Sequence, residues 1–158
     1  PIPVLAIPGN HDLPLYNLFS RFFTPYREYK RFFRKEIECE LRTDSIHLIA
    51  LNSSSPRRHI DGEFNLRHLE EKLKGLDPNA KVKIVAFHHP LDCPKHVDEK
   101  NIVRNCLRVL ELLEEYKVDL VLSGHIHDPL ARLSTVRYSQ ARRPMILSNA
   151  GTCLSYRI

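Results

Sequence analysis

Three apolar runs in this chain end in clusters of residues that can ligate metals. Ile2–Ile7 leads into Gly9-Asn10-His11-Asp12, Val82–Phe87 into His88-His89-Pro90, and Val118–Leu122 into Gly124-His125-Ile126-His127. In an α/β sheet, the loops after the carboxyl ends of strands converge on one crevice. Imidazole nitrogens and amide or carboxylate oxygens suit hard or borderline divalent metals. We therefore predict that the three runs are near neighbours in one sheet and that Asn10, His88 and His125 meet at its edge.

Length and composition indicate one globular domain over residues 1–158. The chain has 158 residues, of which 42% are hydrophobic, and this is enough for a single core. Its apolar runs are far shorter than a membrane span, so we expect no membrane partner. The four cysteines are scattered and form no C-x-x-C pair. This pattern favours reduced thiols and a cytoplasmic protein over a disulfide framework.

Strand and helix patterns alternate along the chain, which predicts the α/β class. The predicted strands are apolar on both faces, which is typical of a sheet buried between two layers. Besides the three runs above, the patterns predict antiparallel strands at Ile37–Arg42 and Ile46–Leu51, helices at Leu15–Phe23, Tyr26–Phe33, Asn65–Leu73 and Asp98–Tyr116, and late strands near Leu130–Tyr138 and Pro144–Leu147. No linker divides the chain.

One segment is both basic and aromatic. Arg21, Arg27, Lys30, Arg31, Arg34 and Lys35 are interleaved with Tyr26, Tyr29, Phe32 and Phe33. Such a segment can bind nucleic acid. We favour an amphipathic helical lid whose aromatic rings pack inward and whose cations are solvated. The cations could also attract an anionic substrate through their field alone.

The histidines near the strand ends differ in what their spacing predicts. His125 and His127 are two apart, so in extended structure both point the same way and can reach one metal or two adjacent metals, with Gly124 allowing a close turn. His88 and His89 are adjacent and point apart, so one of them is expected to bind metal while the other contacts substrate or fills space. His11 beside Asp12 suggests an acid or base oriented by a carboxylate. The alternatives are an Asx turn at residues 10–12 and a pair of surface histidines at 125 and 127.

The ordered set Gly-Asn-His-Asp, His-x-Pro and Gly-His-x-His resembles the calcineurin-like metallophosphoesterase superfamily, and within it the bacterial cyclic-nucleotide-type phosphodiesterases. The resemblance implies a four-layer αββα sandwich and two divalent metal ions, manganese, iron or zinc. It implies that Asn10, His88 and His125 bind the second metal and His127 the first. It also implies that His11 acts on the transition state or the leaving oxygen and that Asp12 orients His11. The implied activity is hydrolysis of a phosphate ester by a hydroxide held between the metals.

The family's Asp-x-His and Gly-Asp motifs, which precede Gly-Asn-His, have no counterpart here, because the chain begins at Pro1. We therefore expect the sandwich to lack its N-terminal strands and the isolated chain to be inactive. An exposed strand edge would then favour a second copy or a separate N-terminal segment as partner. Two other functions stay open: a DNA-processing nuclease of the same superfamily, with nucleic acid a possible but not favoured partner, and a non-catalytic phosphoesterase-like interaction module.

Overall fold

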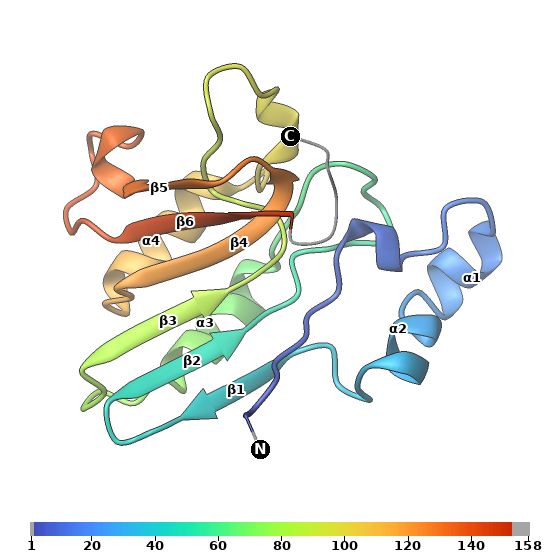
Figure 1. Cartoon of the computed structure of the whole chain (residues 1–158), viewed down its shortest axis with the longest axis horizontal. Coiled ribbons are helices and arrows are strands. Elements are labelled where there is room, and N and C mark those ends of the chain that lie inside the picture. The colour runs from blue at the N-terminus through green and yellow to red at the C-terminus, as the bar shows by residue number, and fades with distance from the viewer. Residues whose placement is uncertain (1, 153–158) are drawn as a thin grey trace.

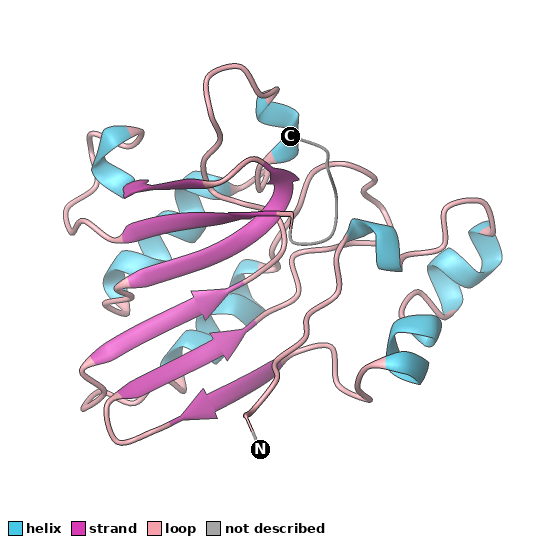
Figure 2. Ribbon diagram, viewed as in Figure 1, coloured by secondary structure: helices cyan, strands magenta, loops and turns pink. Residues whose placement is uncertain are grey.

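The computed structural model describes residues 2–152 and contains one mixed sheet (Figures 1 and 2). Its six strands are β1 (Cys39–Arg42), β2 (Ile46–Ala50), β3 (Val82–Ala86), β4 (Leu120–His127), β5 (Leu130–Leu133) and β6 (Ile146–Gly151). Their order in the sheet is β1-β2-β3-β4-β6-β5. The central pairs are parallel, and the edge strands β1 and β5 are antiparallel to their neighbours. The α/β class predicted from the sequence is confirmed.

Helices α3 (Leu66–Lys74) and α4 (Cys106–Glu115) cover one face of the sheet (Figure 1). Asn65 caps α3 as expected, because its side-chain oxygen accepts hydrogen bonds from the Arg67 and His68 amides. The core between this layer and the sheet includes Leu69, Leu73, Val85, Val109, Leu113 and Val121, all buried.

The opposite face of the sheet carries a row of aliphatic residues that runs across every strand. Directly paired positions share a face, and the register places Leu41, Leu48, Ile84, Leu120, Ile146 and Leu133 in one continuous line. The sheet is therefore apolar on both faces, as its sequence indicates. An apolar row on this second face is the pattern expected of a sheet that is covered on both sides.

The remaining helices are short. They are η1 (Asn10–Asp12), α1 (Leu18–Phe23), α2 (Arg27–Phe32), η2 (Glu99–Asn101) and η3 (Ser134–Val136). Figure 1 shows α1 and α2 beside each other, projecting away from the sheet. The prediction that their aromatic rings pack inward is wrong for the phenylalanines, since Phe32 and Phe33 are exposed, although Tyr29 is buried.

Three predicted elements differ from the structure. The late strand predicted near Leu130–Tyr138 ends at Leu133, where η3 begins. Ile2–Ile7 forms no strand: it is extended but makes no ladder, and Ile2 and Val4 are 90% and 81% exposed. Pro3 and Pro8 contribute to this, because each lacks the amide proton that a ladder requires.

The predicted helix Asp98–Tyr116 is helical only in its second part, after η2 and a turn. The amide of Val103 donates to the carbonyl of Pro90 (2.9 Å) and that of Arg104 to the carbonyl of Gly62 (2.8 Å). These long-range bonds replace the local ones that a continuous helix would need. The apolar spacing of residues 98–105 therefore reflects packing of an irregular segment.

Candidate metal centre

Asn10, His88 and His125 meet at one point, although they come from three distant parts of the chain. His88 follows β3, His125 lies within β4, and Asn10 begins η1. The Nε2 atom of His88 lies 3.0 Å from Oδ1 of Asn10 and 3.2 Å from Nδ1 of His125. The structure thus brings these three residues together at the carboxyl ends of parallel strands.

The amide of Asn10 is held in the orientation that this arrangement needs. Its Nδ2 donates to the backbone carbonyl of His59 at 3.0 Å. Since one end of the amide is used by that contact, the oxygen faces His88. This contact uses the backbone of His59 and not its imidazole.

The spacing and chemistry of these donors fit a divalent metal ion. Two ligands at about 2.0–2.1 Å from a tetrahedral metal lie roughly 3.3 Å apart. The observed separations of 3.0 and 3.2 Å are close to this value. One proton on Nε2 of His88 cannot serve both neighbours, so the three atoms are better explained as lone pairs directed at a common point.

The electrostatics of the cluster also suit metal binding. Burial, and then the neighbouring histidines, lower the pKa of His88 to about 4. Burial, with His11 and His127 nearby, likewise lowers the pKa of His125 to about 4. Both rings are therefore neutral at pH 7, and neutral imidazole is the form that ligates metals.

His89 joins the same group of imidazoles but has a different environment. A ligand nitrogen from each of His88, His89 and His125 lies within 4.8 Å of the others. His89 is fully buried, and its Nε2 has no hydrogen-bond partner among the described residues. Burial lowers its pKa to about 2, so the ring is neutral.

Ser53 indicates which nitrogen of His89 carries the proton. The hydroxyl oxygen of Ser53 accepts the backbone amide of His89 at 3.0 Å and lies 2.9 Å from Nδ1 of the same residue. Among the described hydrogen bonds, Nδ1 is the one acceptor available to the hydroxyl proton of Ser53, so we assign that proton to the bond with Nδ1. Nε2 then carries the ring proton and faces the cluster as a donor. This tautomer leaves Nε2 without a lone pair for a metal ion, and the buried ring fills the space beside His88 and His125.

Two glycines make room for the adjacent imidazoles. A Cβ atom on Gly9 would lie 2.7 Å from Cε1 of His88, and one on Gly62 would lie 2.7 Å from Cβ of His89. Both distances are too short for real contacts, so glycine at these positions permits the rings to sit where they do.

We expect Gly9→Ala to weaken metal binding by displacing the ring of His88. The backbone of Gly9 is extended, with φ −100°, so alanine adds no backbone strain and acts through the collision alone. Gly124→Ala is the matched control, since a Cβ there meets no atom within 4 Å. Calorimetric titration with Zn²⁺ should show reduced affinity for Gly9→Ala only. Equal affinities for both variants would mean that the position of His88 does not determine binding.

His125 and His127 do not follow the simple alternation predicted for extended structure. Both have left-handed backbone conformations, with φ of 70° and 67°. Gly124 was expected to provide the close turn, but the unusual backbone angles belong to the histidines. His125 reaches the cluster, whereas His127 is exposed and lies outside the close group of imidazoles. Its assignment to a first metal stays a prediction.

His11 and Asp12 lie beside the centre but do not form the expected pair. Oδ2 of Asp12 accepts the amide of Gly9 at 2.7 Å, which closes the η1 turn. Among the hydrogen bonds of residues 2–152, none joins Asp12 to His11. His11 is exposed, and it is near enough to His88 and His125 to lower the pKa of both. Asp12 therefore stabilises the turn that presents Asn10 and His11.

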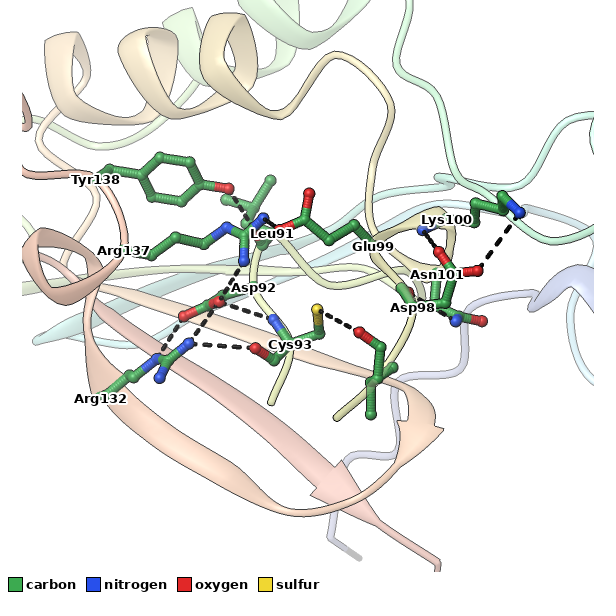
Figure 3. Close-up of polar contacts among 11 residues, drawn as sticks. Leu91, Asp92, Cys93, Asp98, Glu99, Lys100, Asn101, Arg132, Arg137 and Tyr138 are labelled. Carbon is green, nitrogen blue, oxygen red and sulfur yellow. Dashed lines mark hydrogen bonds and ion pairs between the residues drawn. The ribbon is translucent and has the colours of Figure 1, made fainter. Parts of the chain in front are cut away.

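The loop after His89 is held by an ion cluster that sequence reasoning missed (Figure 3). Asp92 has a fully buried side chain and accepts two hydrogen bonds from Arg132, at 2.5 and 2.6 Å. Arg137 lies 3.4 Å from Asp92 and pairs with Glu99 at 2.8 Å. Contacts that span about forty residues leave no local pattern in one sequence, so nothing there marks Asp92.

Comparison with known proteins agrees with this geometry. The family model described as Calcineurin-like phosphoesterase matches residues 1–129. The chain therefore belongs to the calcineurin-like phosphoesterase family. It is also similar to a probable cyclic nucleotide phosphodiesterase from Xenorhabdus bovienii (strain SS-2004), with 25% identity over 140 residues, which covers 80% of this chain and 49% of that protein. The chain thus spans about half the length of the curated relative that it matches.

Two further findings bear on the sequence predictions. Cys39, Cys93 and Cys106 are free thiols, and Cys153 lies outside the described residues. No helix in the part of the chain that the structure describes has the length and hydropathy needed to cross a membrane.

Proposed function

We propose that this chain contributes the second metal position and the leaving-group acid of a metal-dependent phosphodiesterase acting on a cyclic nucleotide or another small phosphate ester. The observation that carries the proposal is the convergence of Asn10 Oδ1, His88 Nε2 and His125 Nδ1. Membership of a phosphoesterase family supports a phosphate-ester substrate. The name of the Xenorhabdus relative supports the cyclic-nucleotide class.

Each residue has a distinct part in the proposed reaction. Asn10, His88 and His125 would hold one divalent ion, manganese, iron or zinc, and His127 would contribute to a second. Divalent ions at such a site neutralise phosphate charge and lower the pKa of water. His11 is exposed and would donate a proton to the leaving oxygen. Placing this donor before substrate arrives reduces the reorganisation that the reaction requires.

We further propose that residues 1–158 form part of one domain in a cytoplasmic protein, and that the chain alone does not turn over substrate. The free cysteines support the location. Inactivity is supported by the donor set: the close group of potential ligands among residues 2–152 contains three imidazoles and no carboxylate. Two dications a few ångströms apart repel strongly unless a bridging anion offsets their charge.

The proposal is tested with the chain alone and with a version extended at its amino end by the family's Asp-x-His and Gly-Asp motifs. We expect the extended protein with Mn²⁺ to hydrolyse 3′,5′-cyclic AMP and bis(p-nitrophenyl) phosphate, and the chain alone to be inactive. Hydrolysis of single-stranded DNA alone would indicate a nuclease. Metal binding without hydrolysis of any of the three would indicate an interaction module.

We expect His11→Ala in the extended protein to lower kcat by roughly 10²–10⁴-fold, the usual contribution of a positioned acid. Metal content, measured by mass spectrometry of the intact protein, should not change, because His11 is exposed and lies outside the cluster. Asn10→Ala is the companion variant and should lose metal. Loss of metal from His11→Ala as well would refute the division of roles between these neighbours.

A further inference from the structure

Helix α1 has the reverse of the usual arrangement of a surface helix, because its charged side chain is buried and its apolar side chains are exposed. Its arginine, Arg21, is buried and donates to three backbone carbonyls, those of Pro14 (2.9 Å), Pro56 (2.6 Å) and Arg58 (2.6 Å). These contacts fix the polar face of α1 against the loops beside the metal centre. The apolar face of the helix is consequently held toward solvent.

The outward face of α1 and the end of α2 both expose apolar side chains, and the two helices lie beside each other (Figure 1). Five of the seven phenylalanines in the chain lie there, each between 55% and 72% exposed. We call this surface the α1–α2 patch: Leu15, Tyr16, Leu18, Phe19, Phe22, Phe23, Phe32 and Phe33. Two of its rings, Phe19 and Phe23, stack with centroids 4.6 Å apart. Exposed apolar residues concentrated in two adjacent helices in this way point to an interaction site.

The segment that carries the α1–α2 patch is also basic. Residues 15–35 contain six lysines and arginines and one acidic residue. Arg21 is buried, so the remaining five cations and one acid give a net charge of +4. Arg27, Lys30 and Arg31 on α2 are exposed. The one acid, Glu28, lies 3.0 Å from Arg27 and 3.6 Å from Arg31, so it offsets only part of this charge.

We propose that the α1–α2 patch binds the surface of an anionic lipid bilayer, with its phenylalanines among the headgroups and its cations on the phosphates. Exposed apolar rings flanked by lysine and arginine are what an interfacial segment requires. A second copy of the chain would bring the same cations face to face, which like-charge repulsion opposes. Nucleic acid would use the rings for stacking but would leave Leu15 and Leu18 unmatched.

Such a contact departs from the expectation of no membrane partner, which rested on the lack of a spanning segment. The contact would be peripheral, and no described helix could cross a membrane. Because η1 leads directly into α1, such binding would hold the metal centre close to the lipid surface. The proposal rests on the exposed faces of α1 and α2 and does not depend on the phosphoesterase function.

The chain has no tryptophan, so one introduced tryptophan reports its own surroundings. We expect the fluorescence of Phe23→Trp to shift to shorter wavelength when vesicles of phosphatidylcholine and phosphatidylglycerol are added, and not with phosphatidylcholine alone. Val136→Trp is the control, since Val136 is exposed in η3 and far from the patch. It should respond to neither vesicle. A response to anionic vesicles that is equal in both variants, or absent from Phe23→Trp, would overturn the proposal.

Two double variants separate the apolar and charged contributions in vesicle sedimentation. Lys30→Glu/Arg31→Glu should lower binding roughly tenfold or more, because each cation near an anionic surface contributes to it. The control Arg67→Glu/Arg108→Glu changes two exposed arginines on α3 and α4 and should bind as the unmodified chain does. Phe19→Ser/Phe23→Ser should also lose binding. If the chain dimerises without lipid and Phe19→Ser/Phe23→Ser abolishes the dimer, the patch binds a second copy of the chain. If the fluorescence of Phe23→Trp shifts with single-stranded DNA and not with vesicles, the patch binds nucleic acid.

Discussion

Replacement of Asp92 by alanine is expected to lower the free energy of unfolding by about 3–5 kcal/mol, because it removes one partner of a buried ion cluster. The side chain of Asp92 is 0% exposed, and those of Arg132 and Arg137 are 26% and 21% exposed. The substitution leaves two largely covered guanidinium groups without their shared carboxylate. Urea denaturation followed by circular dichroism measures the loss.

Two further variants test whether the loss of stability in Asp92→Ala comes from buried arginine charge that has lost its partner. Glu71→Ala breaks the exposed pair with Arg67, whose side chains are 59% and 89% exposed, and should change stability by less than about 1 kcal/mol. Asp92→Ala/Arg132→Met also removes the arginine that Asp92→Ala leaves without its partner, and it should recover part of the stability lost in Asp92→Ala. If the double variant is less stable by the sum of both single effects, the ion cluster is not the cause.

Replacement of His88 by alanine is expected to reduce affinity for Zn²⁺ by at least roughly 100-fold. Loss of a residue that only orients a ligand typically costs 10–100-fold, so loss of a ligand that contacts the other two donors should cost at least as much. His88 is the residue whose Nε2 lies near both Asn10 and His125. Calorimetric titration of the 158-residue chain measures the change.

His68→Ala is the matched control for His88→Ala. It removes one imidazole from α3, where His68 is partly exposed and lies 2.9 Å from Glu38. The control should bind Zn²⁺ as the unmodified chain does. If both variants lose affinity to the same degree, the binding measured is dispersed over surface histidines and not located at the proposed centre.

Much of the fold was predictable because local patterns and tertiary structure agree in the central strands. β3 and β4 are apolar runs followed by polar clusters, and they pair in parallel as expected. The prediction failed where long-range bonds prevailed. Val103 and Arg104 bond to Pro90 and Gly62 instead of continuing α4 toward Asp98.

The convergence of Asn10, His88 and His125 was predicted from their shared position after apolar runs that were all expected to be strands, and this reason was partly wrong. Ile2–Ile7 is not a strand, yet the segment still delivers Asn10 to the same edge of the sheet. The orientation of its amide depends on the His59 carbonyl, which no local pattern reveals. The outward apolar face of α1 was not predicted, because the burial of Arg21 reverses the usual polarity of that helix and depends on the carbonyls of Pro56 and Arg58 in a distant loop.

The central claim is that Asn10, His88 and His125 together hold one divalent ion. Anomalous diffraction at the zinc absorption edge from crystals of the chain grown with Zn²⁺ tests it directly. We predict a peak at about 2.0–2.2 Å from Oδ1 of Asn10, Nε2 of His88 and Nδ1 of His125, with Nε2 of His89 outside bonding distance. A peak bonded to His89 and not to Asn10, or no peak among these residues at saturating Zn²⁺, would contradict the claim.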